Sequence, residues 1–247
     1  MASGRAAGPP APRLRARGRP PAVENPVIVA IDGPSGTGKS STSRAVAAKL
    51  GLNYLDTGAQ YRAITWWMLS NGIDVNDPVA VADAAGKPVI VAGHDPAAPG
   101  ITVDGTDASG PIRTQEVTAA VSAVSAVPEV RARMVELQRA AADTSPAGIV
   151  VEGRDIGTTV FPNATVKIFL TASAEARAAR RSGELNGAQS VADTRAALIK
   201  RDAADSGRKT SPLAKAADAV EVDTTDLTLD QVIECIVTLV EEKRATR

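Results

Sequence analysis

The feature that most constrains this chain is a glycine-rich loop at residues 33–40, with the sequence GPSGTGKS. It follows the apolar run 27–32 and precedes a helix-forming stretch, and this context distinguishes a phosphate-binding loop from a glycine-rich turn that matches by accident. Glycines let successive backbone N–H groups point into one concavity, Lys39 can reach the β- and γ-phosphates, and the Ser40 hydroxyl can ligate Mg²⁺. We therefore predict a nucleoside triphosphate site formed by Gly33, Pro34, Ser35, Gly36, Thr37, Gly38, Lys39, Ser40 and Ser41.

Composition excludes several classes of protein. The 247 residues are enough for one large domain or two small ones. No stretch approaches the roughly 20 apolar residues of a membrane span, and no apolar signal segment follows the start, so we expect a soluble, cytoplasmic protein. The single cysteine, Cys235, excludes an intramolecular disulfide and a multi-cysteine metal site. Its amphipathic surroundings predict a buried or half-buried packing position.

Charge is distributed unevenly along the chain. The totals of 28 basic and 28 acidic residues balance, but residues 1–25 contain five arginines and one glutamate. This tail is rich in Pro, Gly, Ala and Arg, so we expect it to be disordered. Three interpretations stay open: a passive extension or an overlong start assignment, an organelle-targeting segment, and an arm that binds polyanions. Serine is scarce in this tail, which argues against the organelle-targeting interpretation.

The rest of the chain lacks the features of a nucleic-acid-binding surface. Because the tail carries an excess of arginine, residues 26–247 are mildly acidic. Two tryptophans, two tyrosines and two phenylalanines are too few for a platform on which bases of a strand could stack. We therefore expect small-molecule partners and no nucleic acid or membrane.

From residue 26 onward, apolar strand-like runs alternate with helical patterns, which is typical of a parallel α/β sheet. We predict a three-layer α/β/α fold of the phosphate-loop type, with five parallel strands near 27–32, 52–55, 148–152, 166–170 and 219–223. Helices are predicted at 39–50, 59–71, about 114–142 with a break near Pro128, 174–182 and about 191–205. A last helix begins at a capping box, Thr228 and Gln231, and its core face is predicted to comprise Leu229, Val232, Ile233, Ile236, Leu239 and Val240.

One segment interrupts the alternation. Residues 87–91 and 101–104 are short β-like runs separated by turn residues, so we predict a small antiparallel insert, either a hairpin or a three-stranded patch. This insert either has no role in binding or forms a wall over the cleft that binds the acceptor. His94, the only histidine, lies in its turn and is interpreted as a solvated residue without a catalytic role.

Arginines near the ends of predicted strands indicate a second anionic ligand. A cleft that holds a triphosphate and a phosphorylated acceptor must neutralise several negative charges. Arg62 is close to a predicted helix start capped by Thr57, and the run 152–155, EGRD, follows an apolar strand. Arg201, Asp205 and Arg208 have the spacing of one helix face, for which a structural ion-pair ladder is the alternative.

Taken together, these motifs resemble the bacterial cytidylate kinases, within the nucleoside monophosphate kinases. The resemblance runs from residue 27 to about 240 and includes IDGPSG at 31–36, DTGA at 56–59, IRTQEV at 112–117, GRDIGT at 153–158 and VKIFL at 166–170. It also includes Tyr61-Arg62, Pro212-Leu213 and the run 216–219. Several motifs in one order are far more specific than the phosphate loop alone.

The resemblance implies phosphoryl transfer from Mg²⁺-bound ATP to CMP or dCMP, giving CDP or dCDP and ADP. It implies one kinase domain at 26–247, with a monophosphate-binding insert at about 72–113 and a short helical lid at about 180–210, and it suggests a monomer. Lys39, Arg154, Arg180 and Arg201 would be catalytic, with Arg180 at the edge of the lid over the donor phosphates. By position, the family's CMP contacts fall on Thr57, Tyr61, Arg62, Ser122, Arg131, Arg154, Asp155, Arg201, Asp205 and Arg208.

These implied contacts are chemically sensible. Cytosine presents an amino donor at N4 beside acceptors at N3 and O2, so Asp155 can accept from N4 while Arg131 and Ser122 donate. Uracil carries an oxygen in place of that amino group, and a carboxylate would repel it. Members often have Asp where this chain has Glu152 and Ser where it has Thr57, which puts the reach of these groups in question more than their roles. Some members have Gly at Ser40, so a direct Mg²⁺ ligand is more plausible here.

Two alternatives remain at this point. The first is the same chemistry on UMP, AMP, mixed pyrimidine monophosphates or a small hydroxylated acid; the insert and the Ser122, Arg131 and Asp155 set argue against it. The second is a nucleotide-binding switch or assembly factor, which would leave Arg154, Arg201 and Arg208 without a purpose.

Overall fold

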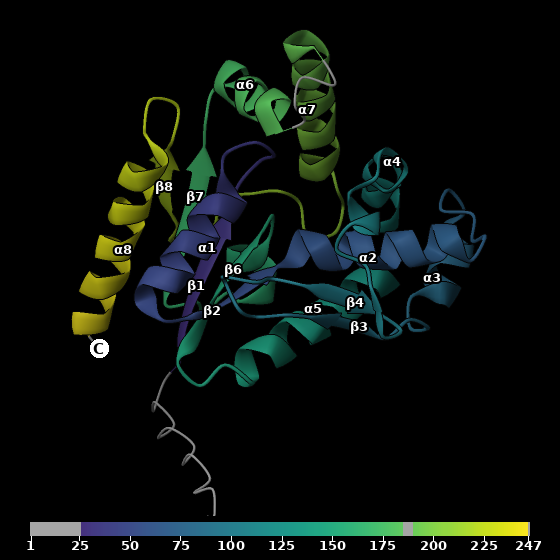
Figure 1. Cartoon of the computed structure of the whole chain (residues 1–247), viewed down its shortest axis with the longest axis horizontal. Helices are drawn as coiled ribbons and strands as arrows, with labels where there is room; N and C mark the ends of the chain where they lie inside the picture. Colours follow the sequence, from purple (N-terminus) through teal and green to yellow (C-terminus); the bar gives the residue numbers. More distant parts are fainter. Residues whose placement is uncertain (1–25, 185–189, 247) are drawn as a thin grey trace, which may run out of the picture.

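The computed structural model describes residues 26–184 and 190–246 (Figure 1). The predicted tail at 1–25 and residues 185–189 of the predicted lid lie outside the described residues. Within the described ranges, no helix combines the length and the apolar character needed to cross a membrane.

The described residues form a five-stranded parallel sheet in the order β2-β6-β1-β7-β8. Because Asp32 pairs with Gly153 and Asp56 with Glu152, the carboxyl ends of three neighbouring strands lie level with one another. The predicted α/β fold is confirmed, and each strand boundary lies within one residue of its prediction. The strands are β1 (Val27–Asp32), β2 (Asn53–Asp56), β6 (Gly148–Gly153), β7 (Val166–Thr171) and β8 (Val220–Asp223).

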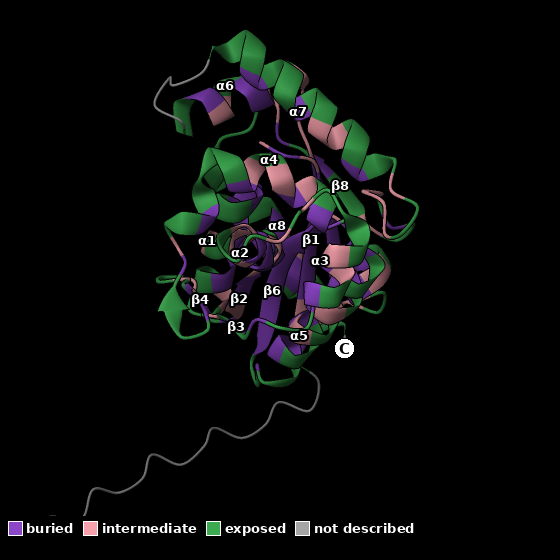
Figure 2. Cartoon of the chain, turned by 90° about the vertical axis from the view of Figure 1, so that its right-hand side faces the viewer, coloured by how far each residue is buried: buried purple, intermediate pink, exposed green. Residues whose placement is uncertain are grey.

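Helices cover both faces of this sheet. Side chains alternate along β1, so that Val29 and Ile31 pack on α1 (Lys39–Leu50) and α8 (Leu229–Ala245). Ala30 points to the other face, which packs on α5 (Pro128–Asp143) and on η2 (Ile156–Val160), a π-helical turn after β6. Figure 2 shows β1 and β6 as buried strands, as expected for a parallel sheet covered on both sides.

A second apolar core lies beside the sheet and contains the predicted insert. There α2 (Thr57–Ser70), α3 (Pro78–Ala84) and α4 (Gln115–Val124) surround a three-stranded antiparallel sheet within the described range 26–184. Its strands are β3 (Ile90–Ala92), β4 (Ile101–Val103) and β5 (Thr106–Asp107), followed by the short helix η1 (Pro111–Arg113). The insert and the break near Pro128 are confirmed. Helix α3 was not predicted, because its seven residues are too few to show a helical period.

The two remaining helices, α6 (Ala174–Glu184) and α7 (Val191–Ser206), pack on each other beyond the carboxyl ends of the strands, at the top of Figure 1. Both expose much of their surface, which is green in Figure 2. They match the predictions at 174–182 and about 191–205.

Three predictions about single residues were wrong. Cys235 is exposed, because the buried face of α8 follows residues 232, 233, 236, 237 and 240 and leaves position 235 on the solvent side. Leu229 is 46% exposed, since it lies in the first turn of α8 at the edge of that face. His94 is half-buried rather than solvated, because its loop packs along β2, where the His94 carbonyl accepts from the Tyr54 N–H at 2.9 Å. The capping box at Thr228 and Gln231 is present.

Asp32 joins the end of β1 to the turn that follows β6. Its buried carboxylate accepts from the backbone N–H groups of Ile156 (2.9 Å) and Gly157 (2.7 Å), the first residues of η2. N–H groups at the start of a helical turn have no partner within the turn, so Asp32 supplies one. The glycine-rich loop at 33–40 and the pair Arg154 and Asp155 are thereby fixed relative to each other.

We predict that Gly148→Ala destabilises the protein by roughly 2–5 kcal/mol, the sum of backbone strain and overpacking. Gly148 has a φ of +111°, and a Cβ atom there would lie 2.3 Å from the Val27 carbonyl oxygen on the neighbouring strand. Gly86→Ala is the matched control, because no heavy atom lies within 4 Å of its added Cβ. Urea unfolding measures both, and equal stability of the two variants would contradict this account.

A second prediction concerns pH. Burial raises the pKa of Asp32 from 3.8 to about 6, against the opposing effect of its hydrogen bonds to Gly157 and Ile156. The folded state therefore takes up a proton on Asp32 in this window, and the Asp32 contribution to the free energy of unfolding falls by about 3 kcal/mol as pH rises from about 4 to 6. Urea unfolding of wild type and Asp32→Asn across this range should show the smaller pH dependence in the variant. Parallel curves would contradict the assignment.

Candidate active site

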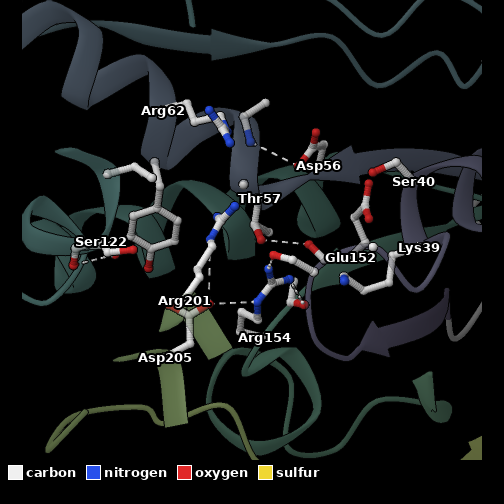
Figure 3. Close-up of a pocket in the computed structure, with 18 of the residues that line it drawn as sticks. Lys39, Ser40, Asp56, Thr57, Arg62, Ser122, Glu152, Arg154, Arg201 and Asp205 are labelled. Atoms are coloured by element: carbon white, nitrogen blue, oxygen red, sulfur yellow. Dashed lines mark hydrogen bonds and ion pairs between the residues drawn. The ribbon is translucent and has the colours of Figure 1, made fainter. Parts of the chain in front are cut away.

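A cleft of about 670 Å³ opens at the carboxyl ends of β1, β2 and β6, under α6 and α7. Figure 3 shows that side chains from the glycine-rich loop, from α2, from the end of β6 and from α7 converge on it. From the predicted triphosphate site, the lining includes Ser35, Gly36, Gly38, Lys39, Ser40 and Ser41. From the predicted CMP contacts, it includes Thr57, Tyr61, Arg62, Ser122, Arg131, Arg154, Asp155, Arg201, Asp205 and Arg208.

The glycine-rich loop has the backbone of an anion-binding cup. Gly36 and Gly38 adopt left-handed conformations, with φ of 80° and 85°. Helix α1 begins directly after Gly38 without a side-chain cap, so its first N–H groups remain available to a ligand. Gly33 has a different role from Gly36 and Gly38. It allows close packing on β7, since a Cβ at this position would lie 2.2 Å from the Leu170 carbonyl oxygen. Of the predicted triphosphate residues, Gly33, Pro34 and Thr37 form the back of the loop and do not line the described cleft.

Lys39 is held inside this loop. Its ammonium group donates to the Pro34 carbonyl at 2.5 Å and lies 3.5 Å from the Thr37 hydroxyl. Burial and the nearby charge of Arg154 lower the pKa of Lys39 well below its usual value, while Glu152 opposes the shift. A phosphate in the cup would stabilise the charged form.

Two carboxylates that line the cleft, Asp56 and Glu152, lie at the ends of β2 and β6. Glu152 is buried, and its carboxylate is hydrogen-bonded to the hydroxyls of Tyr54 and Ser40. Burial and the negative charge of Asp56 raise the pKa of Glu152, against the effect of Tyr54 and Lys39. Asp56 caps α2 by accepting from the Ala59 N–H at 3.0 Å. Figure 3 shows Ser40 and the Glu152 side chain side by side at the loop end of the cleft.

The opposite wall carries a cluster of arginines around one carboxylate. Asp205 is 1% exposed and pairs with Arg154 Nε at 3.0 Å, with Arg201 Nε at 4.0 Å and with Arg208 Nη2. Burial and the charges of Arg154 and Arg62 lower the pKa of Arg201 to about 10. The ion-pair ladder considered from the sequence is therefore present, but one carboxylate cannot balance these guanidinium groups. The surplus positive charge favours an anion in the cleft.

Arg154 connects the two walls. Its Nη2 donates to the Ser35 hydroxyl of the glycine-rich loop at 2.6 Å, while its Nε pairs with Asp205. Arg62 reaches the same space from α2, held by the Thr118 hydroxyl at 2.8 Å and the Ile112 carbonyl at 3.3 Å. Figure 3 shows Arg62, Arg154 and Arg201 extending toward one another from different elements.

One end of the cleft is lined by a buried ion pair and an aromatic ring. Arg131 and Asp155 form a buried ion pair, and Arg131 Nη1 also donates to the Ser125 carbonyl at 3.2 Å. The Arg131 guanidinium lies 5.5 Å from the centre of the Tyr61 ring. Burial raises the pKa of Tyr61 to about 12, so it stays neutral. Ser122 completes this end of the lining.

The structure does not place Arg180 where the resemblance implied. Its guanidinium donates to the Thr224 hydroxyl at 2.9 Å and to the Thr224 carbonyl, and within the described residues it does not line the cleft. Arg181 lines the cleft instead, paired with Glu184 at 2.7 Å. Neighbouring helix positions point about 100° apart, so only one of two consecutive arginines can face a given cleft. Arg44 and Arg113 are further lining cations that the sequence motifs did not assign.

Comparison with known proteins agrees with this geometry. A family model described as cytidylate kinase matches residues 29–242. A cytidylate kinase of Streptomyces avermitilis is 78% identical over 221 residues, which cover 90% of this chain and 95% of the relative. That of Streptomyces coelicolor is 80% identical over 219 residues, 89% of this chain and 94% of the relative. A more distant cytidylate kinase, from Nocardia farcinica, is 51% identical over 228 residues, with 90% and 97% covered. This chain belongs to the cytidylate kinase family.

Proposed function

We propose that this chain transfers the γ-phosphoryl group of ATP to CMP and dCMP, forming CDP, dCDP and ADP. One observation carries the proposal beyond family membership: Arg154 contacts the phosphate loop through Ser35 (2.6 Å) and the arginine cluster through Asp205 (3.0 Å). A guanidinium between two anion sites is placed to stabilise charge on a phosphoryl group that moves from one to the other.

For the donor, we assign the triphosphate to the amide cup of the loop at 33–41, with Lys39 as the neutralising cation. The lining hydroxyl of Ser40 and the carboxylate of Glu152 offer oxygen ligands of the kind Mg²⁺ prefers, so these residues fit the metal. No cluster of three or more His, Cys, Asp or Glu residues suited to a metal exists in the described ranges, which suits an ion that keeps water and phosphate ligands. Ser40 and Glu152 would hold Mg²⁺, which would supply positive charge that offsets the charge of the donor phosphates.

For the acceptor, we assign the base to the end of the cleft formed by Arg131, Asp155 and Ser122. Asp155 uses Oδ2 for Arg131, so Oδ1 can accept from the cytosine N4 amino group. Arg131 and Ser122 are then the donors toward N3 and O2. Asp155 is paired with Arg131, and a carboxylate in this position accepts from the cytosine amino group but repels the O4 of uracil.

For the rest of the monophosphate, we assign the phosphate to Arg62, Arg154 and Arg201. Asp205 and Arg208 lie beside these groups, where the sugar hydroxyls would reach them, and Thr57 and Tyr61 complete the wall. Lys39, Arg154 and Arg201 are the catalytic set in this proposal, since they surround the space between the two anion sites. They neutralise the three equatorial oxygens as the phosphoryl group moves.

We further propose that the chain works as one kinase domain at 26–247, with the insert at about 72–113 enclosing the acceptor and α6 and α7 forming the lid. A lid that closes would exclude water, so that the phosphoryl group reaches CMP and not solvent. We assign the lid cation to Arg181 in place of Arg180, because Arg181 is the one that lines the cleft. We also propose that the chain works as a monomer, as the family resemblance suggests.

The direct test is release of ADP from Mg²⁺-ATP with CMP, dCMP, UMP, AMP and GMP compared side by side. We expect turnover with CMP and dCMP that exceeds turnover with the other three. Lys39→Ala is the negative control, because it removes the cation of the donor site and should lower turnover by about 10²- to 10³-fold. Equal rates with all five acceptors would exclude the assignment.

Base recognition predicts the behaviour of Asp155→Asn. An amide can donate as well as accept, so we expect kcat/KM for CMP to fall by about 10- to 100-fold while the CMP/UMP preference narrows. Steady-state kinetics with both acceptors measure the ratio. If both substrates lose the same factor, Asp155 does not read the base.

Alanine variants of Arg180 and Arg181, the two neighbouring arginines of α6, test which of them is the cation that the lid supplies. Arg181→Ala should lower kcat by roughly 10-fold or more, because it removes a cation that faces the donor phosphates. Arg195→Ala is the matched control, an exposed arginine of α7 paired with Glu175 at 3.0 Å outside the cleft, and its kcat should stay unchanged. Arg180→Ala should lower the thermal stability while sparing kcat. A kcat loss in Arg180→Ala alone would restore the assignment implied by the resemblance.

A further inference from the structure

Tyr54 is a buried phenol in a place where a purely apolar ring would suffice. It is 2% exposed and belongs to the core between the sheet and α1, with Val46, Leu52 and Val150 around it. Burial of a hydroxyl without a partner costs free energy, so a core tyrosine implies a bonded hydroxyl. Here the hydroxyl donates to Oε1 of Glu152.

The sheet register explains how this contact arises. Tyr54 pairs with Val150 and Asp56 with Glu152 on the parallel strands β2 and β6. Residues two apart on a strand share a face, so Tyr54 and Glu152 both point toward α1, whose first residues are Lys39 and Ser40. The phenol therefore approaches the carboxylate from the core, while Ser40 and Lys39 face it from the cleft.

Glu152 needs such an anchor. A glutamate has three rotatable side-chain bonds, and ordering it costs free energy that a single contact with Ser40 would have to offset. The buried Tyr54 hydroxyl donates a second hydrogen bond to the same carboxylate, which offsets part of that cost.

We propose that Tyr54 is a positioning residue for phosphoryl transfer, whose hydroxyl holds the Glu152 carboxylate against Ser40 and Lys39 and thereby orders the end of the donor site that takes Mg²⁺. This inference rests on the proposed function. Tyr54 does not line the cleft of about 670 Å³, whereas Glu152 does, so we assign its effect to the contact with Glu152. Outer contacts that orient a metal-site carboxylate typically change metal affinity or activity by about 10- to 100-fold when removed.

The test is Tyr54→Phe, which keeps the ring and its packing and removes only the hydroxyl. Calorimetry should show that the factor by which Mg²⁺ strengthens ADP binding falls by about 10-fold or more, whereas the affinity for CMP changes less than twofold. In turnover assays the Mg²⁺ concentration for half-maximal rate should rise, with KM for CMP unchanged. An unaltered Mg²⁺ effect on ADP binding would overturn the proposal.

A double-mutant cycle with Glu152→Ala separates positioning from a general loss of stability. If Tyr54 acts through Glu152, adding Tyr54→Phe to Glu152→Ala should leave the Mg²⁺ dependence of ADP binding where Glu152→Ala alone put it. Independent, multiplying losses would show that the hydroxyl acts elsewhere and would also overturn the proposal. Failure of the wild-type enzyme to release ADP with CMP would reject the proposed function, while the ADP calorimetry would still report on Tyr54.

Discussion

The parallel pairing of β1 with β6 is the constraint on which the site depends. It sets Asp32 beside Gly153, so the glycine-rich loop that leaves β1 and the segment EGRD that leaves β6 begin at the same level of the sheet. Asp32 then fixes the second segment by accepting from Ile156 and Gly157. Two walls of the cleft that are more than a hundred residues apart in sequence are thereby held within the reach of one side chain, Arg154.

The side chains that line the cleft carry an unbalanced charge, and this favours anionic ligands. Lys39 is buried with its pKa lowered, and Arg201 has its pKa lowered by burial and by its arginine neighbours. Both shifts mean that the folded protein holds these cations at a cost, since their water has been removed and like charges are close. Negatively charged phosphates in the cleft would reverse the effect. Part of the binding energy thus comes from relief of repulsion already present in the fold.

Much of this architecture could be predicted from the sequence, because continuous apolar runs mark the buried strands and because a capping box and an apolar stripe mark α8. The direction in which an individual side chain points from its helix could not be predicted. Arg180 and Arg181 have the same charge and neighbouring positions, and only the docking of α6 decides which one faces the cleft. Cys235 was misplaced although the core face of α8 was predicted in the right phase, because an amphipathic helix does not bury every apolar residue that it contains.

Tyr54 shows the other limit of sequence reasoning. In the pattern of β2 it counts as one apolar residue, and nothing local distinguishes it from a phenylalanine. The role of its hydroxyl depends on the partner strand, where the register brings Glu152 beside it. Buried polar contacts between strands are of this kind: each partner is unremarkable in its own segment, and the pair exists because tertiary structure brings it together. When a polar atom lies inside an otherwise apolar core, it is therefore worth asking whether its hydrogen-bond partner also lines a functional site.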